Sequence, residues 1–152
     1  MARDRGVAMT DAEVAELLEA QRTVTLATIG PDGRPHLASM WFARDGADLL
    51  MWTYAVSQKA RNIERDPRVT VLAESGHDYA ELRGVSLDCV VEPVTGVGEV
   101  LEIGTLLHRR NTGAGLDDDG VERLRAQAAK RVGLRLRVER VRSWDHRKLA
   151  RL

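Results

Sequence analysis

The clearest hydrophobic pattern of the chain lies between residues 132 and 139. Apolar side chains alternate there with polar or small ones: Val132, Leu134, Leu136 and Val138 with Gly133, Arg135, Arg137 and Glu139. Successive side chains of a strand point to opposite sides, so a period of two gives one buried face and one wet face. The pattern predicts a β-strand.

Five other segments have the composition of strands. They are rich in β-branched and other apolar residues and span 23–29, 36–43, 49–53, 68–73 and 80–91. Turn-forming sequences, Gly30–Gly33 and Arg44–Asp48, separate the first three segments, which are therefore expected to form an antiparallel meander. Pro93 is expected to close the long segment 80–91.

Helical spacing occurs in three further regions. Thr10–Glu13 has the spacing of a capping box and precedes apolar residues on one face, which predicts a helix to about Ala20. A second helix is predicted over 56–66, where the following proline ends it. Residues 94–131 are expected to form two helical pieces around the acidic turn Gly113–Gly120.

The order of these elements indicates the fold class. Strands and helices do not alternate as in a parallel βαβ sheet, because the first three strands follow one another directly. We therefore expect an α+β fold: a six-stranded antiparallel barrel with flanking helices.

Composition narrows the class of function. The 152 residues are the length of one domain with its own core. Apolar residues make up 43% and charged residues 30%, and 23 basic side chains balance 23 acidic ones. This balance leaves no net field to gather nucleic acid or an anionic membrane surface, so neither partner is expected.

Cysteine usage and hydropathy bear on the compartment. Cys89 is the only cysteine, so no disulfide can form within the chain. Met1–Thr10 lacks the apolar run of a secretory signal, and no later stretch reaches the roughly 18 apolar residues of a membrane span. We expect a soluble, cytoplasmic protein.

One segment has the features of an anion site. Polar side chains, including Ser57 and Lys59, cluster where the strand ending at Thr53 gives way to the helix over 56–66. The unpaired amides of a helix's first turn carry about half a positive charge, to which Ser57 and Lys59 would add a hydroxyl donor and a cation. A solvated basic helix face is an equally good interpretation of the residues alone.

Side chains for acid–base, nucleophilic or metal chemistry are not grouped in the sequence. The four histidines lie far apart, without the spacing of metal ligands. Ser39 and Ser57 have no histidine and aspartate at a recognisable spacing, and Cys89 lies in an apolar run where nothing basic would favour a thiolate. No catalytic side chain and no metal are predicted, which suits hydride transfer, where a cofactor carries the reaction.

Several blocks of the sequence occur in a recognisable order: Thr25–Thr28, Gly33–His36, Trp41-Phe42 and Lys59–Val69. Together they resemble the pyridoxamine-phosphate-oxidase superfamily. The closing block, Trp144–Leu149, is similar to the ending of its actinobacterial branch, which uses the deazaflavin coenzyme F420. The resemblance covers residues 10–149 of a single 1–152 domain and implies a split β-barrel of the flavin-binding type.

The resemblance also implies roles for particular residues. Lys59 and Ser57 would hold the cofactor phosphate, and Asn62 would brace that turn. Where many relatives carry an additional arginine near position 57, this chain has Ser57. The family works as a homodimer with two sites at the interface, so Trp144 of the partner would complete a ring site lined by Ser39, Met40, Trp41, Trp52 and Thr53.

The function expected from this resemblance is hydride transfer between coenzyme F420 and a small conjugated or quinone-like molecule. An FMN-dependent oxidoreductase is the alternative among enzymes. A flavin- or haem-binding carrier or sensor without turnover is the alternative outside them, because the sequence supplies no acid–base group.

Overall fold

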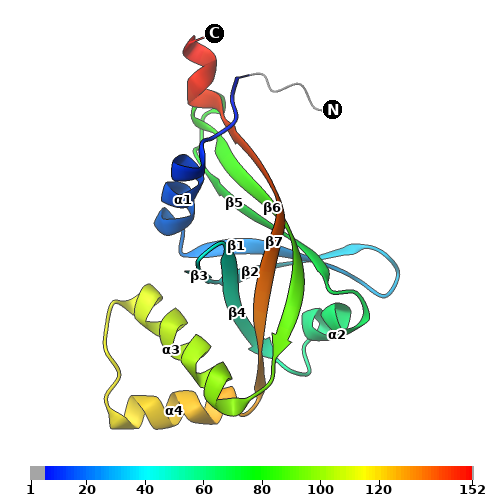
Figure 1. The fold of residues 1–152 in the computed structure, drawn as a ribbon, viewed down its shortest axis with the longest axis vertical. Coiled ribbons are helices and arrows are strands. Elements are labelled where there is room, and N and C mark those ends of the chain that lie inside the picture. Colours follow the sequence, from blue (N-terminus) through cyan, green and yellow to red (C-terminus); the bar gives the residue numbers. More distant parts are fainter. Residues whose placement is uncertain (1–5, 152) are drawn as a thin grey trace.

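Residues 6–151 are described by a computed structural model, in which one curled antiparallel sheet is flanked by helices (Figure 1). The sheet has seven strands in the order β2-β1-β5-β6-β7-β4-β3. Their bounds are β1 Thr23–Ile29, β2 Pro35–Trp41, β3 Ala43–Asp45, β4 Asp48–Tyr54, β5 Arg68–Ser75, β6 Arg83–Val94 and β7 Arg131–Asp145.

The connection between β2 and β3 explains why the sheet curls. These strands lie at opposite edges of the sheet, yet Phe42 alone separates them along the chain. Two edges can share one linking residue only if the sheet bends round until they meet. Phe42 is fully buried at this junction. The α+β class predicted from the sequence is confirmed.

The strand count was predicted wrongly, since the sheet has seven strands and not six. The extra strand is β3, which pairs with β4 through Ala43↔Leu50 and Asp45↔Asp48. The sequence pattern placed Ala43 in the second strand and assigned 44–48 to a turn. Because Asp45 pairs with Asp48, the turn contains only Gly46 and Ala47. Gly46 adopts a positive φ of 60°, as tight hairpin turns require.

The boundaries of β6 also differ from the prediction. Tyr79–Glu81 form a short 3-10 helix, so the strand begins only at Arg83. It then runs through Pro93 to Val94, although proline was expected to close it. Pro93 pairs with Leu134 of β7, and β5 no longer pairs with β6 beyond Val90. Proline is tolerated there because that side of the strand has no sheet neighbour that needs its missing N–H.

Four α-helices occur in the described range: α1 Asp11–Ala20, α2 Gln58–Arg65, α3 Val97–Thr112 and α4 Asp118–Ala128. The cap predicted for α1 is confirmed, since the Glu13 amide donates to Thr10 Oγ1 at 3.2 Å. The turn between α3 and α4 is shorter than expected, because Asp117 caps α4 through the amide of Gly120 at 2.7 Å. A final 3-10 helix, η2, covers His146–Arg151.

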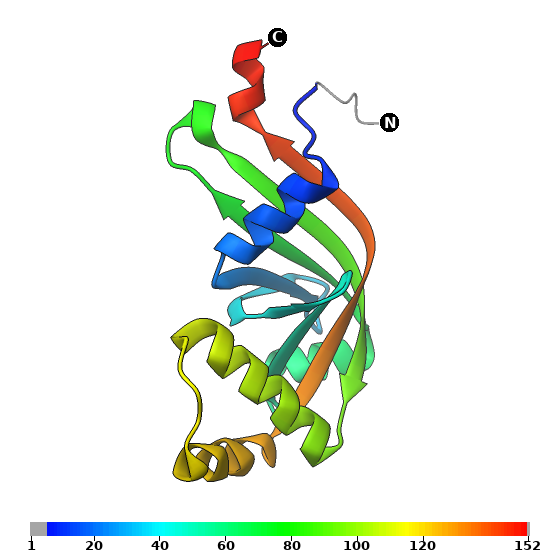
Figure 2. The ribbon, with the colours of Figure 1, turned by 60° about the vertical axis from the view of Figure 1, so that its left-hand side comes forward.

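Two apolar clusters hold these elements together. The larger one fills the inside of the curled sheet under α1 and includes Leu17, Leu26, Met51 and Leu134, all at most 1% exposed. The smaller one joins α3 to the other face of β3 and β4 through Leu50, Ile103 and Leu107 among others. The helices α3 and α4 therefore stand beside β4 and the first half of β7, as Figure 2 shows from the side.

The strand β7 is longer than its clear pattern. The alternation over 132–138 is confirmed, with Leu134 and Leu136 buried and Arg137 exposed. Glu139 is then left without a partner, because Val138 pairs with Cys89 and Arg140 with Asp88. Beyond this bulge the strand runs on to Asp145, with exposed side chains at 140–142 and less exposed ones from 143 onward. Bulges bend and twist a strand, so a simple period does not reveal the second half.

Candidate functional site

Four residues expected to line a ring site meet at one cavity of about 430 Å³. Ser39, Met40 and Trp41 reach it from β2, and Trp52 reaches it from β4. The remaining walls come from α3, α4 and the start of β7: Gly104, Leu107, His108, Leu124, Gln127 and Arg131. The volume lies within the range of about 300–1,000 Å³ that small-molecule sites occupy.

The position of Trp52 in this cavity depends on a glycine. A Cβ atom at Gly104 of α3 would collide with the six-membered ring of Trp52. The indole can therefore approach α3 this closely only because position 104 has no side chain. Glycine in a helix interior reduces helix stability by about 0.5–1 kcal/mol relative to alanine. The packing of Trp52 against α3 offsets this loss.

The two tryptophans give the cavity flat apolar walls. Trp41 is 48% exposed and Trp52 is partly buried, so part of each indole is accessible. Aromatic side chains pack well against flat conjugated rings in offset or edge-on geometries. The cavity is thus suited to a planar, largely apolar ligand with a few polar groups.

The anion site predicted at α2 follows directly along β4. Ser57 caps the helix, because its Oγ accepts from the Ala60 amide at 3.2 Å, and it lies 3.3 Å from Thr53 Oγ1. Lys59, in the first turn, is half-buried and forms no ion pair within residues 6–151. Ser57 is five positions beyond Trp52 in the sequence, a span of at most about 18 Å. Ser57 thus lies beside Thr53, on the side of β4 opposite to Trp52, and Lys59 follows it by two residues.

Asn62 has a bracing position. It is fully buried and its Nδ2 donates to Thr28 Oγ1 of β1 at 3.0 Å. Its Oδ1 accepts from Gln58 Nε2 at 2.8 Å and from an Arg65 guanidinium nitrogen at 3.2 Å. Both polar atoms of the Asn62 side chain are therefore bonded to protein groups, and Asn62 fixes α2 against the sheet.

Thr53 and Trp144 lie away from the cavity of their own chain. Thr53 is 3% exposed and faces the opposite side of β4 from Trp52, because neighbouring strand residues alternate. Trp144 is near the far end of β7, where its ring covers Gly84 of β6 so closely that a Cβ atom there would collide with it. A single chain does not bring these two residues to the tryptophan walls.

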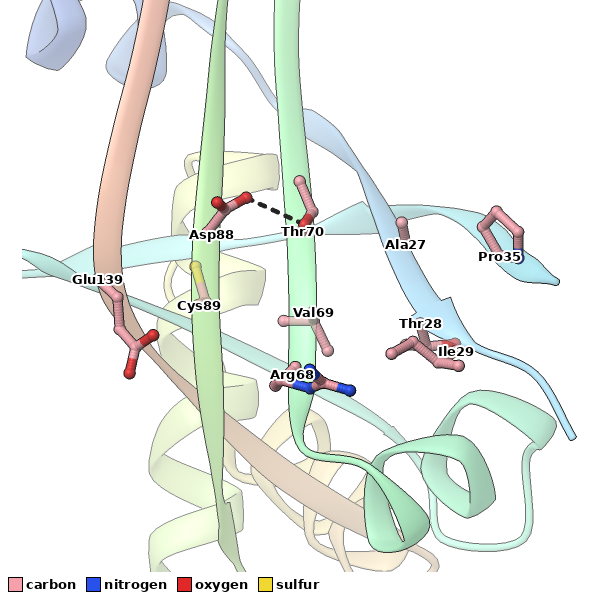
Figure 3. A pocket seen from close by; sticks show the side chains of 10 residues that line it. All are labelled: Ala27, Thr28, Ile29, Pro35, Arg68, Val69, Thr70, Asp88, Cys89 and Glu139. Atoms are coloured by element: carbon pink, nitrogen blue, oxygen red, sulfur yellow. Dashed lines mark hydrogen bonds between the residues drawn. The ribbon is translucent and has the colours of Figure 1, made fainter. Parts of the chain in front are cut away.

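A second cavity of about 460 Å³ lies across β1, β5, β6 and β7 (Figure 3). Its polar groups are largely bound to one another or to neighbours. Thr70 donates to Asp88 at 3.2 Å, Asp88 pairs with Arg142 at 2.6 Å, and Arg68 pairs with Asp66 at 2.7 Å. Such a lining leaves few free groups for a ligand, so this cavity is the weaker candidate.

Cys89 borders the second cavity, and its surroundings match the sequence interpretation. The side chain is 3% exposed, and burial together with nearby carboxylates, led by Asp88, raises the pKa of its thiol to about 12. The thiol therefore stays protonated at neutral pH, which disfavours the thiolate that nucleophilic chemistry needs. Among residues 6–151, no three metal-binding side chains lie close enough together to hold a metal ion.

Comparison with known proteins identifies the family. The family model of pyridoxamine 5'-phosphate oxidase matches residues 10–145. The chain belongs to this family. Its fold is also that of a conserved hypothetical protein of Mycobacterium tuberculosis, with 43% identity, a TM-score of 0.89, and coverage of 99% of this chain and 93% of the other.

Two further solved structures show the range of the family fold. A protein described as an F420 reductase shares 28% identity at a TM-score of 0.67, over 84% of this chain and 94% of its own. The haem storage protein HutZ of Vibrio cholerae shares 18% identity at a TM-score of 0.69, over 88% of this chain and 94% of its own. The second likeness concerns the fold alone.

Sequence patterns did not find the walls contributed by α3, α4 and β7. These residues lie between 104 and 131 and come near Trp52 only through the packing of α3 on the sheet. One local signal was available: Gly104 interrupts an otherwise helix-favouring segment, and such a glycine often has a packing or functional reason.

Within residues 6–151, no helix is both long and apolar enough to cross a membrane.

Proposed function

We propose that this protein is an oxidoreductase that binds coenzyme F420 and transfers a hydride between it and a small conjugated or quinone-like substrate. The observation that carries the proposal is the cavity walled by Trp41 and Trp52, with the unpaired Lys59 further along the same chain segment. The 28% identity to an F420 reductase supports F420 as the cofactor.

The groups present fit a cofactor with a flat ring and a phosphate. Trp41, Met40 and Trp52 would flank the ring, and Ser39 would offer it a hydroxyl group. Lys59 and the first-turn amides of α2 would hold the phosphate, because a cation and a helix N-terminus both stabilise an anion. The cofactor, when bound, supplies the hydride chemistry. The chain binds, orients and shields it, and its cavity lining contains no carboxylate.

Assembly as a homodimer is part of this proposal. Large apolar side chains are exposed on several elements, including Leu37 at 64%, Tyr54 at 50% and Val141 at 51%. Exposed apolar surface of this kind favours association with a second copy. In a dimer, Trp144 would contribute to the partner's ring site, although it lies away from the cavity of its own chain.

The test is to purify the protein from an F420-producing host, record its absorption spectrum, and titrate the stripped protein with F420 and with FMN. We expect the blue-shifted absorption and strong fluorescence of a deazaflavin, and quenching of tryptophan fluorescence on titration. Trp41→Phe and Trp52→Phe should each reduce the quenching. Tighter binding of FMN would favour the FMN enzyme, and a Soret band would favour a haem carrier; either result contradicts F420 as the cofactor.

A further inference from the structure

Arg131 holds an unusual position at the ring cavity. It is the first residue of β7, directly across from Tyr54 of β4, and it lines the cavity beside Gln127 of α4. The central carbon of its guanidinium lies 4.5 Å from the centroid of the Trp52 ring and 4.2 Å from that of Tyr54. Its Nε is buried and has no hydrogen-bond partner.

Three other arginines of the same strand form ion pairs, and a fourth, Arg140, is exposed to solvent. Arg135 is 2.8 Å from Asp45, Arg137 is 2.8 Å from Glu92 and Arg142 is 2.6 Å from Asp88. Arg131 forms no ion pair in the part of the chain that the structure describes. Glu64 borders a neighbouring cavity to which Arg131 also contributes, but the two side chains do not pair.

The cavity therefore holds one permanent cation and no acidic side chain. A partly buried charge without a counter-ion is unfavourable, and stacking on two aromatic rings compensates for only part of its lost hydration. Stacking uses the faces of the planar guanidinium and not the N–H groups of its edge, which form the fork that matches a carboxylate. An anion in the cavity would supply the counter-ion that the guanidinium lacks among the described residues.

We propose that the cavity recognises the carboxylate of its substrate through Arg131, so that the hydride-exchanging substrate is a conjugated carboxylate. This inference rests on the proposed function, because it assigns the substrate to the same cavity. The conjugated part of the substrate lies beside the cofactor ring that Trp41 and Trp52 would flank, and Arg131 fixes its charged end. Arg131 is thus a specificity-determining residue, and neutral analogues of the same shape bind weakly.

The first test measures binding without any cofactor. Cinnamate and its neutral analogue cinnamamide are titrated by calorimetry into the full-length apoprotein and into Arg131→Gln, Arg131→Lys and Arg140→Gln. Arg140 is the matched control, because it lies on the same strand, is exposed and does not line the cavity. The parent and Arg140→Gln should bind cinnamate at least about tenfold more tightly than cinnamamide, the effect of one charge-assisted contact.

The variants separate charge from geometry. Arg131→Gln should bind cinnamate and cinnamamide equally within about twofold, and Arg131→Lys should keep part of the preference, because lysine retains the charge but not the planar fork. Equal binding of the two probes by the parent would overturn the proposal. So would an unchanged preference in Arg131→Gln.

A measurement on the unmodified protein guards against misfolded variants. The ¹⁵N–¹H signal of Arg131 Nε should shift on addition of cinnamate and stay in place with cinnamamide; no shift with cinnamate would overturn the proposal. F420 is titrated separately. Failure to bind F420 with Arg131-dependent cinnamate binding intact would contradict only the cofactor assignment. Loss of F420 binding but not of cinnamate binding in Arg131→Gln would mean that Arg131 recognises the cofactor, and would overturn the substrate assignment.

Discussion

Lys59 is the residue on which the phosphate assignment depends. A charge-assisted hydrogen bond contributes roughly 1.5–3 kcal/mol, so Lys59→Ala should weaken F420 binding by about 10- to 150-fold. Stability should hardly change, because Lys59 forms no ion pair within the described residues. Titration of the cofactor at fixed salt measures the effect.

The matched control for Lys59 is Lys130, which is exposed in the turn after α4. Lys130→Ala should stay within about 0.5 kcal/mol of the parent in both stability and affinity. If the two variants bind F420 with equal affinity, Lys59 is a solvated surface charge and the site at α2 loses its main support.

Asp145 tests an electrostatic contact at the end of β7. Its carboxylate is buried and accepts hydrogen bonds from Arg147, at 2.9 Å from Nε and 2.7 Å from a terminal nitrogen. These bonds lower the pKa of Asp145 below its ordinary value of 3.8. Because the folded-state pKa is depressed, the stabilisation is complete above the unfolded pKa and disappears as pH falls through the folded one.

Asp145→Asn should therefore reduce the free energy of unfolding by about 1–2 kcal/mol at pH 7, a modest loss since Arg147 itself is half-exposed. Denaturant titrations at several pH values should show the difference shrinking below pH 3.8. Asp78→Asn serves as control, because Asp78 is exposed and its side chain forms no described bond. A difference that does not change with pH would exclude ionisation of Asp145 as the cause.

At the scale of elements, the packing of α3 on β4 shapes the cavity. Gly104→Ala should push the Trp52 ring aside, because the new Cβ would collide with it. Overpacking costs typically about 1–3 kcal/mol, which outweighs the roughly 0.5–1 kcal/mol that alanine adds to helix stability. We expect a lower melting temperature and a changed tryptophan emission spectrum.

Gly98→Ala is the control for this packing effect, because nothing lies within 4 Å of a Cβ at that position of the same helix. It should leave the emission spectrum unchanged and leave stability equal or slightly raised. If Gly104→Ala behaves like Gly98→Ala, α3 does not determine the position of Trp52.

For the whole molecule, we predict a C2 homodimer with two cofactor sites. Analytical ultracentrifugation should show a species of twice the 16.9 kDa chain mass, binding two molecules of F420. Trp144→Phe should weaken cofactor binding even though Trp144 packs on Gly84, away from the cavity of its own chain. A stable monomer that binds F420 tightly would contradict this assembly.

Much of the molecule followed from local sequence signals. The alternation from Val132 to Val138 predicted its strand, and Thr10 predicted the start of α1, because side-chain direction and helix capping depend only on neighbouring residues. The family resemblance also selected Ser39, Met40, Trp41 and Trp52, which the fold brings to one cavity.

Only the tertiary structure decided the rest. The strand β3 exists because the curled sheet brings residues 43–45 beside β4, and Pro93 stays in a strand because β5, which begins opposite Val90, does not extend alongside it. Likewise, Arg131 meets Trp52 and Tyr54 across two strands that lie far apart in sequence. Such contacts depend on which distant segments become neighbours in the fold. A local hydrophobic period along the chain cannot predict those neighbours.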